Sequence, residues 1–194
     1  MRVLAVLAHD RKDSLNAYLF NKLIEHLKAE QCEVDILDLH DRAKDIPFYS
    51  SIRDPFTGGY PLLDTNPFYQ ELKDRFMAAD RLVIVHPVYW YSVPGILKCW
   101  IDLITNHFWR YEGGIWATPK HKIKKMLIVH TASASWLTYK FVLANTARTT
   151  LWQTFRWFGI PKVYFYEIFS VYSQNERTVA RHVNKILKLS KKLL

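Results

Sequence analysis

The stretch Arg81-Leu82-Val83-Ile84-Val85-His86 decides the fold, because its four central residues form an unbroken aliphatic run. A short continuous apolar run of this kind is typical of a strand that is buried on both faces of a sheet. Segments with helical periodicity flank it at 68–79 and 93–106, and Pro67 suits the first turn of the earlier one. A buried strand between two helices indicates a parallel sheet that is covered on both sides.

The same alternation extends in both directions along the chain. Further strands are predicted at 3–8, 33–39, 126–130 and 163–171, and further helices at 14–30, 137–158 and 175–194. The connection 40–66 is long and irregular, but the order of the elements continues across it. We therefore predict an α/β protein with one domain over 1–194. Its expected form is a flavodoxin-like three-layer sandwich with a five-stranded parallel sheet in the order 2-1-3-4-5.

Composition narrows the class of protein. The 194 residues are 49% hydrophobic and 23% charged, which fits a globular protein and excludes disordered and collagen-like chains. Cys32 and Cys99 are too few for a disulfide framework or a cysteine-rich zinc site, and no histidine pair has metal-ligand spacing, so we expect no metal. The apolar run at the N-terminus is too short for a signal peptide, and none is long enough to cross a membrane. We expect a cytoplasmic protein.

Ligands of open parallel sheets bind beyond the carboxyl ends of the strands. This rule selects the segments 9–16, 87–91 and 131–135. In the third segment, small and hydroxylated residues would allow close approach of the backbone to a ligand. None of the three contains the Gly-x-Ser-x-Gly turn of a serine hydrolase.

The first of these segments has neither a Gly-x-Gly-x-x-Gly turn nor a P-loop lysine. It nevertheless opens a helix, whose free N–H groups and positive dipole end attract anions. Polar or cationic side chains available there are His9, Arg11, Lys12, Ser14 and Asn16. The alternative is that Asp13 and Ser14 only cap the helix.

The second segment contains three consecutive aromatic residues, Tyr89, Trp90 and Tyr91. Three neighbours at the end of a strand cannot all point into the core, so at least one is expected to face the crevice. A planar ligand would gain from stacking and from apolar walls there. Core packing between the strand and the next helix is the alternative.

The sequence resembles the NAD(P)H:quinone oxidoreductase family of flavodoxin-like flavoproteins, which includes DT-diaphorase, the bacterial modulator-of-drug-activity reductases and the ancillary reductases of potassium-efflux systems. The strongest match is the run 87–102, PVYWYSVPGILKCWID, against a family pattern of Pro, a Trp shortly after it, and Pro-x-x-Leu-Lys-x-Trp-(Ile/Phe)-(Asp/Glu). Ala8-His9 followed by Ser14-Leu15-Asn16 resembles the flavin phosphate loop of the family. The resemblance is strong over 1–131 and looser beyond.

The resemblance implies a flavin site. The phosphate would be held by His9, Ser14, Leu15 and Asn16, the isoalloxazine lined by Pro87, Val88, Tyr89, Trp90 and Tyr91, and its edge contacted by Thr131, Ala132 and Ser133. The implied reaction is ping-pong: NAD(P)H gives a hydride to FMN or FAD, and a quinone or similar acceptor then takes two electrons. The sequence leaves the choices between FMN and FAD, and between NADH and NADPH, open, although the short chain favours FMN.

Further roles follow from the same resemblance. Tyr139 stands near a family tyrosine that stabilises charge on the reduced flavin, and we take it as the candidate catalytic residue. Phe108, Trp109 and Tyr111 are expected at the acceptor pocket and at the interface of a homodimer.

The chain departs from the family pattern where the family has Gly-Gly, since Ala132-Ser133 stand there. Their side chains would narrow the approach to the flavin, or redirect a turn that needs positive φ. This favours, as an alternative, a flavin-binding regulatory or ancillary subunit with weak turnover, for example of a potassium-efflux system.

The net charge of +9 raises the question of a polyanionic partner. The stretch 177–192 holds six basic residues and no acidic one, but its apolar stripe is typical of a helix with a solvated face. Since no nucleic-acid-binding motif is present, we expect no nucleic-acid partner. Peripheral contact with a membrane protein or an anionic surface is the remaining alternative for this stretch.

Overall fold

The computed structural model describes residues 1–46, 65–105, 109–111 and 117–194. Within them, the main sheet contains β1 (Arg2–Leu7), β2 (Glu33–Asp38), β3 (Arg81–Pro87), β6 (Lys125–Thr131) and β7 (Lys162–Ile168). Its strands are all parallel and lie in the order β2-β1-β3-β6-β7. Numbered within the sheet, this is 2-1-3-4-5, so the predicted flavodoxin-like α/β fold is confirmed.

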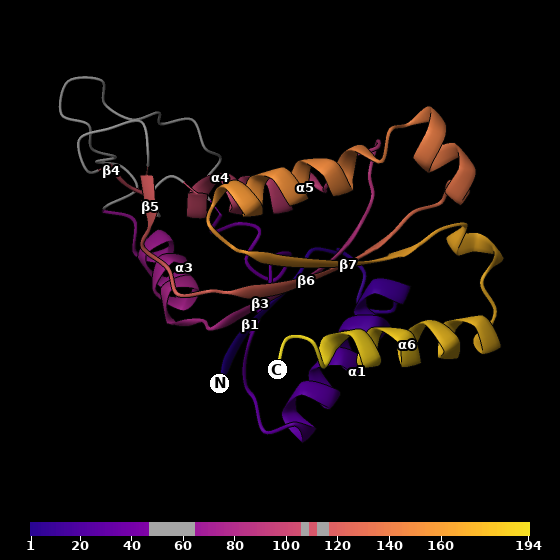
Figure 1. The fold of residues 1–194 in the computed structure, drawn as a ribbon, viewed down its shortest axis with the longest axis horizontal. Coiled ribbons are helices and arrows are strands. Elements are labelled where there is room, and N and C mark those ends of the chain that lie inside the picture. Colours follow the sequence, from indigo (N-terminus) through magenta and orange to yellow (C-terminus); the bar gives the residue numbers. More distant parts are fainter. Residues whose placement is uncertain (47–64, 106–108, 112–116) are drawn as a thin grey trace.

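Helices cover both faces of this sheet and complete three layers (Figure 1). On one face lie α1 (Leu15–Ala29) and α6 (Glu176–Ser190), and on the other lie α3 (Pro67–Ala78), α4 (Gly95–Thr105) and α5 (Thr146–Trp157). Alternate residues of each strand point to opposite layers, so Leu82 and Ile84 pack toward α3 and α4, while Val83 and Val85 pack toward α1. Because helices cover both faces of the sheet, the central strands are buried on both sides and appear in the sequence as unbroken apolar runs.

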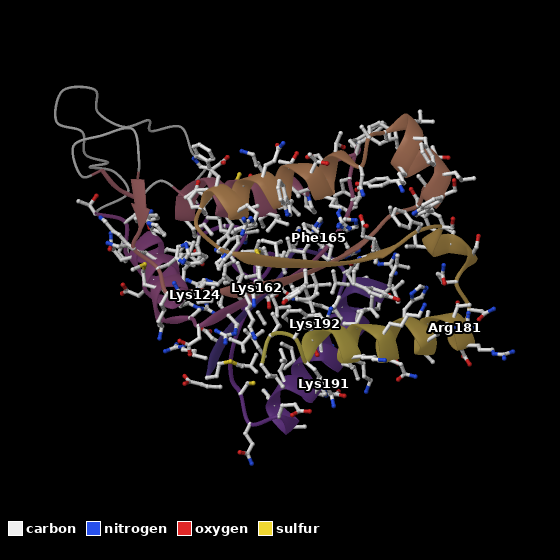
Figure 2. All side chains as sticks on the ribbon, in the orientation of Figure 1. Lys124, Lys162, Phe165, Arg181, Lys191 and Lys192 are labelled. Atoms are coloured by element: carbon white, nitrogen blue, oxygen red, sulfur yellow. The ribbon has the colours of Figure 1, made fainter. Side chains whose placement is uncertain are left out.

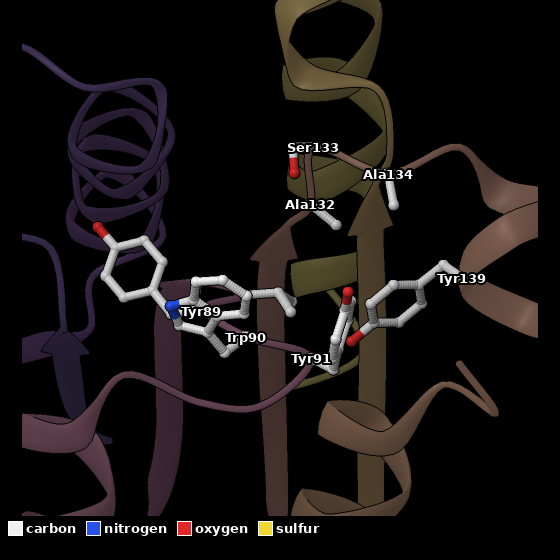
Figure 3. Close-up of a pocket in the computed structure, with 8 residues that line it drawn as sticks. Tyr89, Trp90, Tyr91, Ala132, Ser133, Ala134 and Tyr139 are labelled. Atoms are coloured by element: carbon white, nitrogen blue, oxygen red, sulfur yellow. The ribbon is translucent and has the colours of Figure 1, made fainter. Parts of the chain in front are cut away.

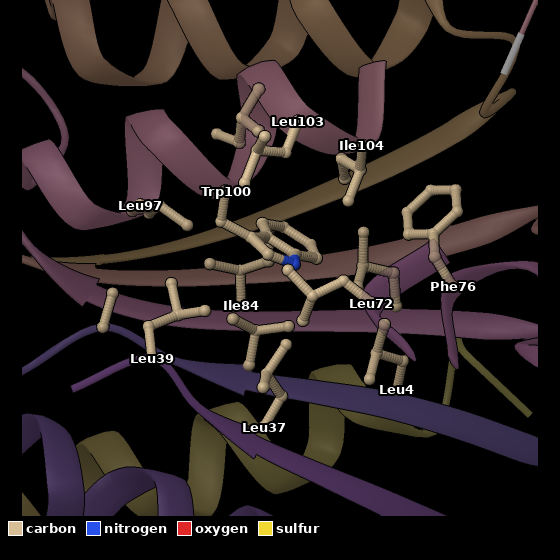
Figure 4. Packing of buried hydrophobic residues seen from close by; sticks show 14 of the residues in the cluster. Leu4, Leu37, Leu39, Leu72, Phe76, Ile84, Leu97, Trp100, Leu103 and Ile104 are labelled. Atoms are coloured by element: carbon tan, nitrogen blue, oxygen red, sulfur yellow. The ribbon is translucent and has the colours of Figure 1, made fainter. Parts of the chain in front are cut away.

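Trp100 anchors the larger of the two cores. Its side chain is fully buried, and it meets Phe76 edge-to-face with ring centroids 6.3 Å apart. Figure 4 shows Trp100 above Ile84 of the sheet, with Leu97 and Leu103 of the same helix beside it. α4 therefore packs directly on β3, the strand that the aromatic segment follows.

The expected single helix over 137–158 is wrong. The chain forms a π-helix, η1 (Thr138–Val142), then passes through left-handed backbone at Ala144 (φ 50°) and Asn145 (φ 47°) before α5 begins. Asparagine tolerates this conformation better than most residues, and its side-chain Nδ2 donates to Glu167 Oε1 at 3.0 Å. The hydrogen bond from Asn145 to Glu167 of β7 therefore fixes the position of the break between η1 and α5. The predicted end of the helix is confirmed, since Gly159 follows it with φ 85°.

The segment 163–171 is not one strand either. β7 ends at Ile168, Ser170 is left-handed with φ 51°, and a single 3-10 turn, η2 (Val171–Ser173), follows. The sequence also did not predict the small antiparallel pair of β4 (Trp109–Tyr111) and β5 (Ala117–Pro119). Strands of three residues carry too little periodicity to be recognised.

The basic residues at the C-terminal end lie on α6 and just beyond it, on the other side of the sheet from α5 (Figure 2). Lys191 approaches Glu30, the residue that caps the C-terminus of α1, at 4.0 Å, and Lys192 Nζ lies 5.6 Å from the ring centroid of Tyr164. These two charges therefore have partners within the chain, whereas Arg181 is exposed. Among the described residues, none of the helices is at once long and apolar enough to span a membrane.

Candidate functional site

Two adjoining cavities lie at the carboxyl ends of β1, β3 and β6. The first, called here the α1 cavity, has a volume of about 500 Å³ and lies at the N-terminus of α1. The second, called here the turn cavity, has a volume of about 420 Å³ and lies beside the turn after β3. They share Val88, Tyr89 and Ser133. Together they bring together all twelve residues expected at a flavin: His9, Ser14, Leu15, Asn16, Pro87, Val88, Tyr89, Trp90, Tyr91, Thr131, Ala132 and Ser133.

The N-terminus of α1 forms one wall of the α1 cavity. Ser14 is the capping residue, and its hydroxyl accepts a hydrogen bond from the Ala17 N–H at 3.1 Å. Capping by Ser14, raised above as an alternative, is thus present, but Ser14 also faces the cavity. Asp13 instead forms a two-pronged pair with Arg11, at 3.1 and 3.0 Å. The other backbone N–H groups of the first turn have no partner within the helix and are left to meet an anion.

Two of the expected polar groups of this wall differ in what they offer. His9 Nδ1 accepts the Arg11 backbone N–H at 3.0 Å, which leaves the ring proton on Nε2. Burial lowers the pKa of His9 more than the Asp10 carboxylate raises it, so the ring is a neutral donor at pH 7. Lys12 does not line the cavity, because its ammonium group is paired with Asp38 and Asp41.

Asn16 of α1 is hydrogen-bonded to Thr131 of β6, and both residues line the α1 cavity. It is 3% exposed, and its Nδ2 donates to Thr131 Oγ1 at 2.9 Å across the gap between α1 and β6. Its Oδ1 has no hydrogen-bond partner among the described residues. A buried amide oxygen in this state is a ready acceptor for a donor on a ligand.

The turn after β3 places its aromatic side chains outside the core (Figure 3). Tyr89, Trp90 and Tyr91 are 45%, 91% and 50% exposed, and all three line the turn cavity. Core packing, the alternative considered for these residues, is therefore wrong. The hydroxyl of Thr146, at the start of α5, donates to the Tyr91 carbonyl and ties the turn to that helix.

The segment after β6 forms the opposite wall. Ala132 N–H donates to Ile168 O at 2.8 Å, and Val88 N–H donates to Thr131 O at 2.7 Å. These two bonds hold the backbone of residues 131 and 132 between the ends of β7 and β3. Neither Ala132 nor Ser133 has positive φ, so the absence of glycine does not redirect the chain here. Both side chains do line the turn cavity, as Figure 3 shows.

Tyr139 closes the inner end of the turn cavity. It comes from η1 and is only 1% exposed, although its ring reaches the cavity. Burial raises the pKa of Tyr139 to about 12, and the nearby charge of Glu167 adds to the effect. The hydroxyl therefore keeps its proton near neutral pH and can act as a hydrogen-bond donor.

Other expectations have different outcomes. Phe108 lies outside the described residues, while Trp109 and Tyr111 are placed on β4, opposite Pro119 and Ala117 of β5. The sequence also missed residues that line the α1 cavity from η2, namely Val171 and Tyr172. They follow the last strand of the sheet, and the left-handed residue that turns them toward the cavity is a serine, which gives no recognisable turn pattern.

Comparisons with known proteins agree with this architecture. The family model described as "Flavodoxin-like fold" matches residues 1–189. An Escherichia coli (strain K12) protein, "Uncharacterized NAD(P)H oxidoreductase YcaK", is 27% identical over 135 residues, which are 66% of this chain and 64% of that protein. The match thus spans less than two thirds of this relative's length.

Two solved structures extend the likeness over nearly the whole chain. A Methanothermobacter marburgensis NAD(P)H:quinone oxidoreductase superposes with a TM-score of 0.77 at 17% identity, covering 100% of this chain and 96% of that one. An FMN-dependent NADH-azoreductase from Bacillus anthracis, solved in complex with FMN, gives 0.80 at 18% identity, covering 99% and 98%. At these identities the likeness concerns the fold. By the match of its family model over 1–189, the chain belongs to the flavodoxin-like fold family.

Proposed function

We propose that this protein is an FMN-dependent NAD(P)H oxidoreductase that reduces a quinone or a similar acceptor. One observation carries the proposal: an anion-binding helix terminus and an aromatic turn line two cavities that share Val88, Tyr89 and Ser133. A phosphorylated ligand with a planar ring needs this combination. The names of the Escherichia coli relative and of the two solved structures, an NAD(P)H oxidoreductase, a quinone oxidoreductase and an FMN-dependent azoreductase, support the same chemistry.

The residues present fit FMN. Its phosphate would meet the first N–H groups of α1, the Ser14 hydroxyl and the His9 Nε2 proton, while Asn16 Oδ1, otherwise unpaired, would accept from a ribityl hydroxyl. Its ring would lie in the turn cavity between the aromatic turn and the wall at Ala132. Both cavities have volumes typical of small-molecule sites, about 300–1,000 Å³. FAD would need further space for its adenosine, so FMN is the better fit.

Bound FMN supplies a ring that takes a hydride from NAD(P)H and passes two electrons to the acceptor. The chain contributes placement. Trp90 presents a wide exposed ring at the mouth of the turn cavity, against which a nicotinamide and then an acceptor ring would stack in turn, as ping-pong exchange requires. Tyr139 would donate a hydrogen bond from its neutral hydroxyl to an oxygen in the cavity and so stabilise negative charge there.

We also propose that the protein is a homodimer. Apolar side chains on and next to η1 are at least 49% exposed, and they lie beside the turn cavity: Trp136, Leu137, Phe141 and Val142. Contiguous exposed apolar surface of this kind marks an interface. Light scattering should show a dimer that Phe141→Glu dissociates, whereas Trp157→Glu, at an exposed tryptophan on α5, should leave the mass unchanged.

The weaker alternative is an ancillary subunit with slow turnover, acting on a membrane protein. Side chains rather than glycines at Ala132 and Ser133 favour it, because they take up room in the turn cavity. If they restrict the site, the double change Ala132→Gly and Ser133→Gly should raise quinone reduction about tenfold or more. An unchanged rate would leave the reductase as the proposed function.

The direct test is the visible spectrum of the purified protein and chromatography of the flavin it releases. We expect bound FMN, and saturable NADH or NADPH oxidation with a panel of quinones. Ser14→Ala should weaken FMN binding about tenfold, because it removes a phosphate contact. Asn175→Ala is the matched control, since Asn175 caps α6 in the same way, from Oδ1 to the Thr178 N–H at 3.0 Å, away from the site. A protein that stays colourless when offered FMN and FAD contradicts the proposal.

A further inference from the structure

A row of basic side chains runs along the outer side of α6. Arg177, Arg181, Lys185 and Lys188 follow one another at steps of four, four and three residues, so they lie on one face of the helix. These four residues are called here the α6 row. All four are exposed, and Ile186, which is buried in the core under the helix, lies on the other side of α6. The row therefore faces solvent along about three turns of the helix.

The charge of the α6 row is not neutralised by acidic side chains. None of its four residues forms an ion pair with a residue that the structure describes. α6 has one acidic residue, Glu176, which is turned by about 100° from Arg177 around the helix axis. At the nearby end of α1, Glu25 and the capping residue Glu30 are paired with lysines outside the row. Like charges four residues apart destabilise a helix, so the row is unfavourable unless an anion lies against it.

Two further lysines extend the basic surface beyond the end of the helix (Figure 2). Lys192 Nζ lies 5.6 Å from the ring centroid of Tyr164, on the face of β7 that α6 covers. Lys162 is exposed at the start of the same strand, and it shares the face of Tyr164 because it lies two residues before it. The basic surface thus runs from the first turn of α6 to the edge of the sheet, over about 20 Å.

The form of this surface limits what can bind it. The α6 row lines neither of the two cavities described above. α6 packs against α1 in one layer, and two helices side by side are wider than a DNA major groove, which admits one. The stretch 173–194 has no Phe, Tyr or Trp on which bases could stack. A stable protein interface would need an apolar centre, and the row contains no apolar residue.

An anionic lipid surface requires none of these features. Its charge is diffuse, and clusters of four to eight Lys or Arg on an amphipathic helix are attracted to it electrostatically. The apolar stripe of α6 is buried against the sheet, so α6 cannot insert between lipids as a free amphipathic helix does. Contact through the α6 row would therefore depend on charge, and salt would weaken it.

We propose that the α6 row docks the protein on a membrane surface that carries anionic lipid headgroups. The inference goes beyond the proposed function and does not depend on it. It also has a consequence for the orientation of the molecule. α6 begins soon after η2, where Tyr172 is 90% exposed and lines the α1 cavity. Docking through the row holds this side of the cavity beside the lipid surface.

Sedimentation with lipid vesicles tests the proposal. The protein should bind vesicles made of equal parts of phosphatidylcholine and phosphatidylglycerol, called here mixed vesicles, and should not bind vesicles of phosphatidylcholine alone. Raising the salt concentration from about 0.05 M to about 0.5 M should weaken binding to the mixed vesicles at least about tenfold, because the Debye length shrinks. Equal binding to both kinds of vesicle, or binding that salt leaves unchanged, overturns the proposal.

Paired substitutions separate the α6 row from the net charge of the protein. Arg181→Gln combined with Lys185→Gln should weaken binding to the mixed vesicles at least about tenfold, because each basic residue near such a surface contributes about fivefold. The matched control is Lys98→Gln combined with Arg156→Gln, which removes the same charge from exposed residues of α4 and α5 on the other face of the sheet. It should weaken binding about twofold at most. Equal losses in the two variants would show attraction by net charge alone and overturn the proposal.

A footprint of the unaltered protein locates the docking face. Mixed vesicles should slow the acetylation of Lys185 and Lys188, followed by mass spectrometry, at least about twofold, and should leave that of Lys98 unchanged. Protection of Lys98 without protection of the other two overturns the proposal. So does random-sequence duplex DNA that displaces the protein from mixed vesicles of equal total charge at about 0.15 M salt, since the row would then serve a nucleic acid.

Discussion

Tyr89 and Ser92 exchange two backbone hydrogen bonds, from Tyr89 N–H to Ser92 O at 3.0 Å and from Ser92 N–H to Tyr89 O at 2.9 Å. The two residues between them, Trp90 and Tyr91, both have positive φ, at 45° and 64°. Positive φ at both central positions is the hairpin turn that Asn-Gly prefers. A side chain with Cβ costs about 1–2 kcal/mol at each such position, so the aromatic residues are placed here at the expense of stability.

Because the aromatic residues strain this turn, replacing them should change the free energy of unfolding and the affinity for FMN in opposite senses. Changing Trp90→Asn together with Tyr91→Gly should keep the turn and raise the free energy of unfolding by about 1–2 kcal/mol, since Asn-Gly adopts it readily. FMN affinity should fall at least about tenfold, because two aromatic walls of the turn cavity are lost. Urea denaturation and fluorescence titration measure the two effects. Trp157→Gln, at an exposed tryptophan on α5, should change neither. Unchanged FMN affinity in the double variant would separate this turn from the ligand.

The hydrogen bond between Asn16 and Thr131 should be measurable as a coupling energy. Asn16→Ala and Thr131→Val should each destabilise the protein, and the double variant should lose less than their sum, by about 1 kcal/mol, because each change already breaks the same bond. Urea denaturation of the four proteins gives the value. Combined with Thr178→Val, which removes the hydroxyl that accepts from the Asn175 N–H in the capping box of α6, Asn16→Ala should instead be additive. Additive effects for Asn16 and Thr131 would show that their contact contributes nothing.

The sheet and the position of the site follow from the sequence for one physical reason. Runs such as 82–85 must be buried on both faces, and this requirement fixes the parallel order and brings the ends of β1, β3 and β6 together. Backbone geometry at non-glycine residues does not follow in this way. Trp90 is left-handed in a turn closed by Tyr89 and Ser92, although its single-residue propensity argues against that conformation. Asn145 tolerates the conformation, but its contact with Glu167, distant in sequence, fixes the position of the break.

His86 of β3, His130 of β6 and Glu167 of β7 lie in one rung of the sheet and show the same limit. Each of these residues, met singly in the sequence, resembles an ordinary polar residue at the end of a strand. Only the register of the three strands places them side by side. The sequence alone does not say which residues of neighbouring strands pair, and a shift of the pairing by one residue would move each side chain to the other face of the sheet.

The two described glycines are expected to respond oppositely to alanine. At Gly159, with φ 85°, a Cβ would lie 2.5 Å from Pro119 Cγ, so Gly159→Ala combines backbone strain with a clash and should cost about 2 kcal/mol or more. At Gly95, in the first turn of α4, a Cβ would meet nothing within 4 Å. Gly95→Ala should therefore be neutral or stabilise the protein by up to about 1 kcal/mol. Thermal unfolding of both variants decides this, and equal effects would contradict it.

Burial of neutral His86 should make stability depend on pH. Its pKa is about 3 in the folded protein and about 6.5 in an unfolded chain, so the unfolded state binds the extra proton between these values. Stability should therefore be full above about pH 6.5 and should fall as pH drops toward 3, by several kcal/mol in total. Glu167, whose folded pKa of about 2 lies below its ordinary value, adds a loss in the same direction below about pH 4.5.

The test of this dependence is His86→Phe, which removes the titrating group and keeps an aromatic ring in the core. Urea denaturation at pH 7 and pH 5 should show a clear loss of stability for the original protein between the two values. The variant should lose less over the same interval, whatever its stability at pH 7, because Glu167 stays ionised at both pH values and contributes little there. If the two proteins lose equal stability from pH 7 to pH 5, His86 is not held neutral by its burial. The acid sensitivity would then have to come from other groups.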